Sequence, residues 1–374
     1  MSITEIHPGI AARMEDVSGQ PASTPHPWAP VKISRAEIEA EIERLATAPR
    51  PANGRRAARI VHPSATAPGR GLSPGVSVTI EVLNPGESTR PLKENAHRIE
   101  IGIGGSGRIE VAETEIALAC LDVANLPSMQ PFRFRNDSGE VWARLSYSNA
   151  PLLEKLGVHY AQDLSEAWTR EPCAATSGDG AKYTRSTAPD IPIGDAGARL
   201  RGYEFLTDIE VVDSCPLHWP WADVRSHLPV APGDGKRQIM ALYNPATERR
   251  QGATHSFFVT AMIVAPGTKP PKRGRGHRHS SVAINYHFSG SGVSTVGGQD
   301  ISWEAGDLLL SAPGWLEHAH YNGPEGFGAY TVQDHPLHIG MESLVWQEDM
   351  NGPVLALGSE PGQTGYVGPR VAGD

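Results

Sequence analysis

The sequence predicts an all-β protein built from two similar halves. Glycine and proline are abundant, at 40 and 32 of the 374 residues, and both favour turns. Apolar and polar residues alternate in strand fashion from about residue 77 to about 150, and again from about 238 to about 347. No long helical heptad pattern interrupts these stretches. Short strands joined by many turns are therefore expected.

The alternation also suggests how the chain is divided. One helix is predicted before the first half, because Ser34 and Glu37 form a capping box and Ile38, Ile42 and Leu45 lie on one stripe. A Gly- and Ser-containing stretch separates the halves. The expected divisions are a flexible leader (1–30), a first domain (31–165), a linker (166–204), a second domain (205–350) and a tail (351–374).

Charge and composition exclude several classes of protein. The net charge of -9 and the lack of a basic stripe argue against a nucleic-acid partner. No apolar run reaches transmembrane length, and the N-terminus lacks the apolar core of a signal peptide. Cys120, Cys173 and Cys215 show no paired spacing, so we expect free thiols in a soluble, cytoplasmic protein.

The two halves repeat each other. Residues 84–111, NPGESTRPLKENAHRIEIGIGGSGRIEV, match residues 265–296, APGTKPPKRGRGHRHSSVAINYHFSGSGVSTV. Gly105 and Gly107 fall on Gly290 and Gly292 in this register. The repeat predicts two units of the same fold.

Three histidines of the second half form a candidate metal site. His277 and His279 alternate along a strand and can point to the same face, and His318 follows on a later strand. Three neutral nitrogen ligands on one side leave the other side of a metal open, as in catalytic sites. The matching positions in the first half are Leu92, Glu94 and Phe132, and Phe134 matches His320. We therefore expect one metal site, with the first half filled by apolar side chains.

These motifs together resemble the bicupins, which carry two tandem cupin (jelly-roll) barrels. Within that group the second half is similar to the gentisate 1,2-dioxygenase and salicylate dioxygenase family. The matching elements are PLHWPWADV, RQIMALYNPATERR, VAPGTKPP, HRHSSVA, APGWLEHAHYN and VQDHPL, in preserved order over about 135 residues. The resemblance implies an all-β bicupin with a few short helices and a metal held in the mouth of one barrel.

The resemblance also implies roles for particular residues. It makes His277, His279 and His318 the ligands of Fe(II), and it places His320 near the substrate as a proton donor or shuttle. Asp334 matches an aspartate that supports the active site in the family. Arg237 matches a substrate-contacting arginine, and Trp315 matches a residue near the site.

The chain departs from the family pattern at several positions. The family arginine that pairs with the substrate carboxylate is replaced by Asn285, and a family glutamine by Met262. The metal-binding half is the second rather than the first. Charge support for a carboxylate is then expected from Arg273 and Arg275, on the loop before His277.

The predicted function is that of an Fe(II)-dependent ring-cleaving dioxygenase. Its substrates would be O₂ and a hydroxylated or amino-substituted aromatic carboxylic acid of the gentisate, salicylate or hydroxynaphthoate type, and the protein would form a homodimer or homotetramer. Two alternatives remain open at this point. One is a cupin lyase, isomerase or decarboxylase that uses Mn, Ni or Zn. The other is a small-molecule-binding cupin without turnover.

Overall fold

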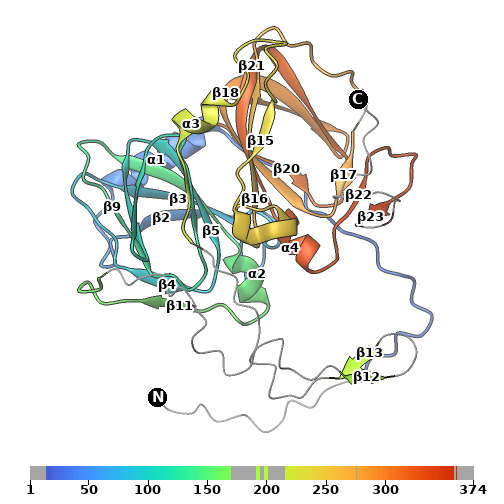
Figure 1. The fold of residues 1–374 in the computed structure, drawn as a ribbon, viewed down its shortest axis with the longest axis horizontal. Helices are drawn as coiled ribbons and strands as arrows, with labels where there is room; N and C mark the ends of the chain where they lie inside the picture. Colours follow the sequence, from blue (N-terminus) through green and yellow to red (C-terminus); the bar gives the residue numbers. More distant parts are fainter. Residues whose placement is uncertain are drawn as a thin grey trace.

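Two β-barrels lie side by side in the computed structural model, which describes residues 14–169, 191–193, 198–200, 215–274, 276–357 and 359 (Figure 1). The first barrel is drawn in blue to green and the second in yellow to red. The prediction of an all-β fold with a few short helices is confirmed.

The first barrel is built from a six-stranded and a five-stranded sheet among the described residues. Their orders are β14-β8-β5-β10-β3-β2 and β11-β4-β9-β6-β7. The strands are β2 (Arg56–Ile60), β3 (Ser77–Leu83), β4 (Leu92–Glu94), β5 (Arg98–Gly104), β6 (Gly107–Val111), β7 (Thr114–Leu118), β8 (Val123–Leu126), β9 (Phe132–Arg135), β10 (Trp142–Ser148), β11 (Ala161–Asp163) and β14 (His218–Trp219).

The second barrel combines a seven-stranded sheet with a three-stranded one in the part of the chain described. The larger sheet has the order β1-β20-β18-β21-β16-β15, with β19 paired to β18, and the smaller has the order β17-β22-β23. The strands are β1 (Val31–Ile33), β15 (Ile239–Ala241), β16 (Phe258–Val264), β17 (Arg278–His279), β18 (Val282–Val296), β19 (Gln299–Glu304), β20 (Leu308–Pro313), β21 (His318–Gln333), β22 (Val345–Gln347) and β23 (Leu355–Ala356).

Helices lie mostly at the ends of these sheets. They are α1 (Arg35–Thr47), α2 (Ala150–Lys155), α3 (Trp221–Ser226), α4 (His335–Gly340) and a 3₁₀ helix (Pro245–Arg250). Ser34 caps α1, and both hydrogen bonds of the predicted capping box with Glu37 are present. The helix buries Ile38 and Leu45 against the first barrel.

Each barrel includes one short strand that lies next to the other barrel in the sequence. Strand β1, which precedes the first barrel in the chain, pairs with β20 of the second. Strand β14, which precedes the second barrel, pairs with β8 of the first. In the predicted linker, β12 (Ile191–Ile193) and β13 (Ala198–Leu200) form a small hairpin, and the linker's other residues from 170 to 204 lie outside the described residues. The division into domains therefore stays a proposal, with strands crossing its boundaries.

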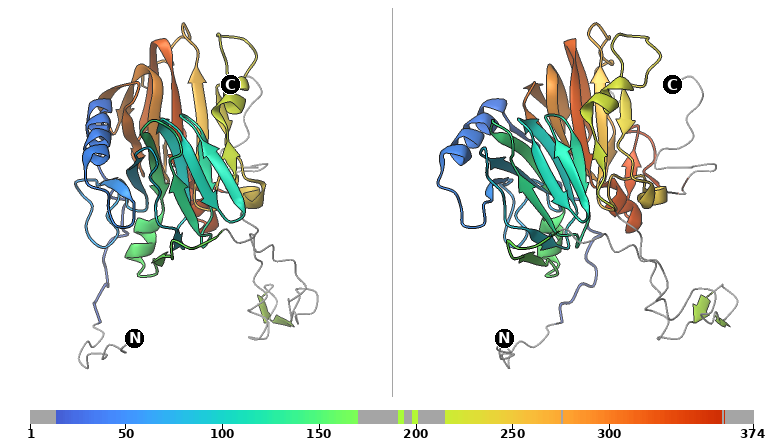
Figure 2. Two further views of the ribbon diagram at one scale, coloured as in Figure 1. Left: turned by 90° about the vertical axis from the view of Figure 1, so that its left-hand side faces the viewer. Right: turned by 60° about the vertical axis from the view of Figure 1, so that its left-hand side comes forward.

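A shared apolar core joins the two barrels. It takes alternate residues from both large sheets, including Ile99 and Leu145 of the first barrel and Ile284, Tyr286 and Tyr330 of the second. Figure 2 shows the strands of the two barrels running alongside each other. Because side chains alternate along a strand, the residues next to these core residues point into the interior of each barrel.

None of the described helices is long and apolar enough to cross a bilayer. Cys120 and Cys215 are free and exposed, and Cys173 lies outside the described residues.

Candidate metal centre

His277, His279 and His318 come together at one end of the second barrel. Each offers one ring nitrogen, and these three atoms lie within 4.8 Å of one another. The backbones of His277 and His318 exchange two hydrogen bonds, at 3.1 and 2.9 Å, which fixes the spacing of their side chains. Strand β17 is held in turn by β22, where His279 pairs with Trp346.

Hydrogen bonds orient two of the three imidazoles. His279 Nδ1 donates to the carbonyl oxygen of Ser281 at 2.9 Å, and His318 Nδ1 donates to the carbonyl oxygen of Leu316 at 3.0 Å. With the proton on Nδ1, each Nε2 carries a lone pair that is available to a cation. Metal-binding histidines are commonly oriented by such a hydrogen bond from the ring nitrogen that does not bind the metal.

Burial keeps the triad neutral. It lowers the pKa of His279 and His318 well below the ordinary value, and the neighbouring histidines lower it further. Burial also lowers the pKa of His277. Neutral imidazole is the form that binds a metal, so the triad is ready for a metal at neutral pH.

His320 lies one alternation further along β21, with its ring centroid 5.9 Å from that of His318. Its Nδ1 contacts Ser294 Oγ at 2.7 Å. Burial and the nearby His277 lower the pKa of His320 to about 4. Asn285 is buried on the inward face of β18, and its Oδ1 has no hydrogen-bond partner among the described residues.

Trp315 and Asp334 lie on the side of strand β17 that faces away from the triad. The guanidinium of Arg278, which alternates away from the triad, lies 4.5 Å from the centroid of the Trp315 ring. Both Trp315 and Asp334 line an outer groove of about 580 Å³ between the barrels. Asp334 Oδ1 accepts a hydrogen bond from the backbone N–H of Val282 at 2.8 Å, which ties the start of β18 to the start of α4.

Two of the predicted arginines, Arg237 and Arg273, are exposed. Arg273 pairs with Asp300 at 2.6 Å and lines a cavity of about 260 Å³ together with His318 and Tyr321. Arg237 is exposed just before β15, and no contact with the triad is recorded for it in the described part of the chain. Arg275 lies outside the described residues.

Sequence reasoning missed the support given by Ser281 and His335. Ser281 Oγ contacts both His279 Nδ1, at 2.9 Å, and His335 Nδ1, at 2.7 Å. Burial lowers the pKa of His335 to about 3, so this histidine is neutral as well. His335 directly follows Asp334 in the VQDHPL element, and this was the one available signal.

The first barrel reproduces the site's backbone without its ligands. Leu92 of β4 pairs with Phe132 of β9, just as His277 bridges to His318 in the second barrel. The predicted register of the repeat is therefore confirmed at this point. No His/Cys/Asp/Glu group with metal-binding geometry was found at this place in the described residues.

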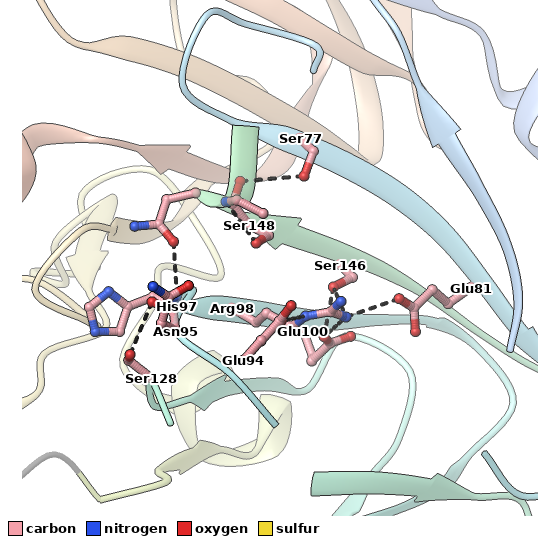
Figure 3. Close-up of polar contacts among 12 residues, drawn as sticks. Ser77, Glu81, Glu94, Asn95, His97, Arg98, Glu100, Ser128, Ser146 and Ser148 are labelled. Carbon is pink, nitrogen blue, oxygen red and sulfur yellow. Dashed lines mark hydrogen bonds and ion pairs between the residues drawn. The ribbon is translucent and has the colours of Figure 1, made fainter. Parts of the chain in front are cut away.

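The interior of the first barrel is not simply apolar, which corrects the sequence prediction. Besides Phe132, Phe134 and Trp142 it holds five charged side chains, here called the ionic cluster, of which Figure 3 shows all but Arg144. The cluster consists of Glu81, Glu94, Arg98, Glu100 and Arg144. Glu94 stands where the second barrel has His279, and Glu100 stands where it has Asn285.

Comparison with known proteins was made by sequence and by fold. No family model matches the chain. The 5-nitrosalicylic acid 1,2-dioxygenase of Bradyrhizobium is 29% identical over 158 residues, which cover 40% of this chain and 74% of that protein. A gentisate 1,2-dioxygenase of Streptomyces is 36% identical over 149 residues, or 38% of this chain and 36% of that enzyme.

Among solved structures, the salicylate 1,2-dioxygenase of Pseudaminobacter salicylatoxidans aligns over 88% of this chain and 90% of its own, with a TM-score of 0.66 and 14% identity. The chain has a bicupin fold like that of this enzyme, and part of its sequence is similar to the nitrosalicylate and gentisate dioxygenases. At this identity the structural likeness establishes the fold of the bicupin alone. The aligned residues cover about a third of the Streptomyces enzyme. The activity of the bicupin is therefore a proposal, and it depends on the bicupin's own site.

Proposed function

We propose that the bicupin is an Fe(II)-dependent dioxygenase that cleaves the ring of an aromatic carboxylic acid with O₂. The observation that carries this proposal is the buried, neutral triad of His277, His279 and His318 in a chain whose named relatives act on nitrosalicylate and gentisate. Three neutral ligands would leave the metal its full charge and an open side, which suits binding of an acidic phenol together with oxygen.

Iron held by the triad would bind the substrate's oxygen donors and would let electrons pass from the electron-rich ring to O₂. The chain's own residues would do the rest. His320 would donate a hydrogen bond to an oxygen atom of the bound acid, and as a proton shuttle it would take up a proton on one ring nitrogen as it releases one from the other. Asn285, on the neighbouring strand β18, would contact the substrate at the position where the family carries an arginine.

The substrate carboxylate would need a cation. Arg273 and Arg275 are proposed for that role because they lie on the loop directly before His277. Arg237, Trp315 and Asp334 remain proposals from the resemblance. The contacts of Asp334 favour a role in holding β18, and Trp315 would act at the outer groove.

The substrate class would be hydroxylated or amino-substituted benzoates and naphthoates. Relatives named for 5-aminosalicylate and 1-hydroxy-2-naphthoate, and a salicylate 1,2-dioxygenase structure with gentisate, support this range. A homodimer or homotetramer is proposed from the resemblance, and light scattering on the purified protein would test it.

One experiment separates the candidate functions. The protein is purified without oxygen, its metals are quantified, and oxygen uptake is followed with salicylate, gentisate, 5-aminosalicylate and 1-hydroxy-2-naphthoate. Uptake that requires Fe(II) and removes the aromatic absorbance supports ring cleavage. Bound Zn or Mn without uptake indicates a cupin of another reaction class, and no bound metal indicates a binding protein.

A further inference from the structure

A hydrogen-bonded chain of three side chains ends beside the triad. Trp303 Nε1, on β19, donates to Ser294 Oγ at 2.9 Å, and Ser294 Oγ lies 2.7 Å from His320 Nδ1. Ser294 is completely buried and Trp303 is 2% exposed. Ser294 and His320 are cross-strand neighbours of β18 and β21, so the sheet itself sets their separation.

The direction of each hydrogen bond follows from the donor chemistry. An indole N–H can only donate, so Ser294 Oγ accepts from Trp303. In the described structure the hydroxyl hydrogen of Ser294 then has one recorded acceptor, His320 Nδ1. If His320 donated instead, this buried hydrogen would lose its partner, which costs about 1–3 kcal/mol. The hydrogen bonds are therefore donated from Trp303 to Ser294 and from Ser294 to His320. The neutral imidazole of His320 then carries its proton on Nε2.

We propose that Ser294 and Trp303 are positioning residues that hold His320 with an Nε2–H donor facing the interior beside the triad. His318 and His320 alternate to the same face of β21, and His320 Nε2 has no recorded hydrogen-bond partner in the described structure. A fixed N–H donor there would stabilise an oxygen atom of the bound acid as negative charge grows on it. The catalytic part of this inference rests on the proposed function.

The indole is itself held in place. The His287 ring stacks on Trp303, with centroids 3.7 Å apart and planes 10° apart. A Cβ at Gly292 would lie 2.4 Å from Trp303 Cζ2, so the glycine makes room for the indole. No residue of this chain of contacts belongs to the triad.

The tautomer can be observed directly. The metal-free, full-length protein is labelled with ¹⁵N-histidine, and the His320 signals are assigned with a His320→Gln variant. The proposal predicts a proton on Nε2 in the wild type and in Ser294→Thr, which keeps the hydroxyl. It predicts a shift toward the Nδ1–H form in Ser294→Ala and in Trp303→Phe. Ser302→Ala, which removes an exposed hydroxyl beside Trp303, is the matched control and should change nothing.

Kinetics of the iron-loaded protein give the second readout. Ser294→Ala should lower kcat about tenfold with KM within about twofold, and Ser294→Thr should restore most of kcat, because the lost group acts on the reacting atoms rather than on affinity. An Nδ1–H form in the wild type, or an unchanged tautomer in Ser294→Ala, would overturn the inference. If the tautomers behave as predicted but the wild type cleaves no aromatic acid, the proposed function fails and the positioning role stands.

Discussion

Replacing Glu100 with glutamine should stabilise the protein at about pH 8 and have much less effect at about pH 5. Glu100 lies in the ionic cluster of the first barrel, where three carboxylates face two guanidinium groups. Arg144 Nε donates to Glu100 at 3.1 Å and Ser146 Oγ donates to it at 2.7 Å. The cluster therefore carries one more negative charge than positive charge when every carboxylate is ionised.

The size of the effect follows from the pKa of Glu100. Burial, and then the charge of Glu81, raise the pKa of Glu100 from 4.5 to about 7. Because the folded state holds the proton more tightly than the unfolded state, stability is lost as the pH rises from 4.5 through 7. The loss sums to about 3 kcal/mol when complete. Glutamine mimics the neutral form, so the advantage of the variant should grow by about 2 kcal/mol between pH 5 and pH 8.

The same substitution at Glu94 is the matched control, and its effect should have the opposite sign. Burial opposes ionisation of Glu94, but the charge of Arg98, 2.5 Å away, and a contact with His159 hold its pKa at about 2. A lowered pKa gives stability that is present above pH 4.5 and is lost as the pH falls toward 2. Glu94→Gln should therefore destabilise the neutral protein by up to about 3 kcal/mol.

Urea unfolding, followed by circular dichroism at pH 5 and pH 8, measures both effects. Wild type, Glu100→Gln and Glu94→Gln are compared with the same metal content. If Glu100→Gln is less stable than wild type at pH 8, or if its effect does not depend on pH, the assignment of the retained proton to Glu100 is wrong.

Four further predictions concern the second barrel. His318→Ala should abolish metal binding measured by mass spectrometry, while Phe132→Ala, at the matching position of the first barrel, should keep one metal per chain. Ser281→Ala should weaken metal affinity about tenfold in a chelator competition, because the hydroxyl that joins His279 to His335 is lost. Metal affinity should fall less between pH 7 and pH 6 than it would for exposed histidines, since burial lowers the pKa values of the triad and so weakens the competition from protons. A fall as steep as that of exposed histidines would contradict the burial of the ligands. Arg273→Ala and Arg275→Ala should raise the Michaelis constant for the acid, and unchanged values in both would remove these residues from the substrate site.

The metal triad was accessible to sequence reasoning because its determinants are local. His277 and His279 are two residues apart, and the repeat gave the register in which Leu92 and Phe132 replace two of the ligands. The inward face of β18 was also predictable, since Tyr286 packs in the core between the barrels while Asn285 points inside. Strict alternation along one strand is a strong signal.

The remaining features depend on contacts between distant segments. The apolar filling expected for the first barrel was partly wrong, because Glu81 and Arg144 meet across β3 and β10 at a sequence separation of 63 residues. Strand β1 is three residues long and strand β14 is two residues long. Both are too short to show a periodic pattern of apolar residues, so their pairing with the other barrel could not be predicted from the sequence. The sequence around Ser294 and Trp303 is typical of ordinary β-strands. Their hydrogen bond depends on the pairing of β18 with β19, which the sequence pattern does not reveal.

The most direct test of the central claim is the stoichiometry of oxygen uptake. The anaerobically purified protein is loaded with one Fe(II) per chain, mixed with gentisate or salicylate, and followed with an oxygen electrode while the aromatic absorbance is recorded. We expect one O₂ to be consumed per ring lost, with no uptake by His318→Ala. Oxygen uptake that persists in His318→Ala, or a fully iron-loaded wild type that consumes no oxygen with any acid of the panel, would contradict it.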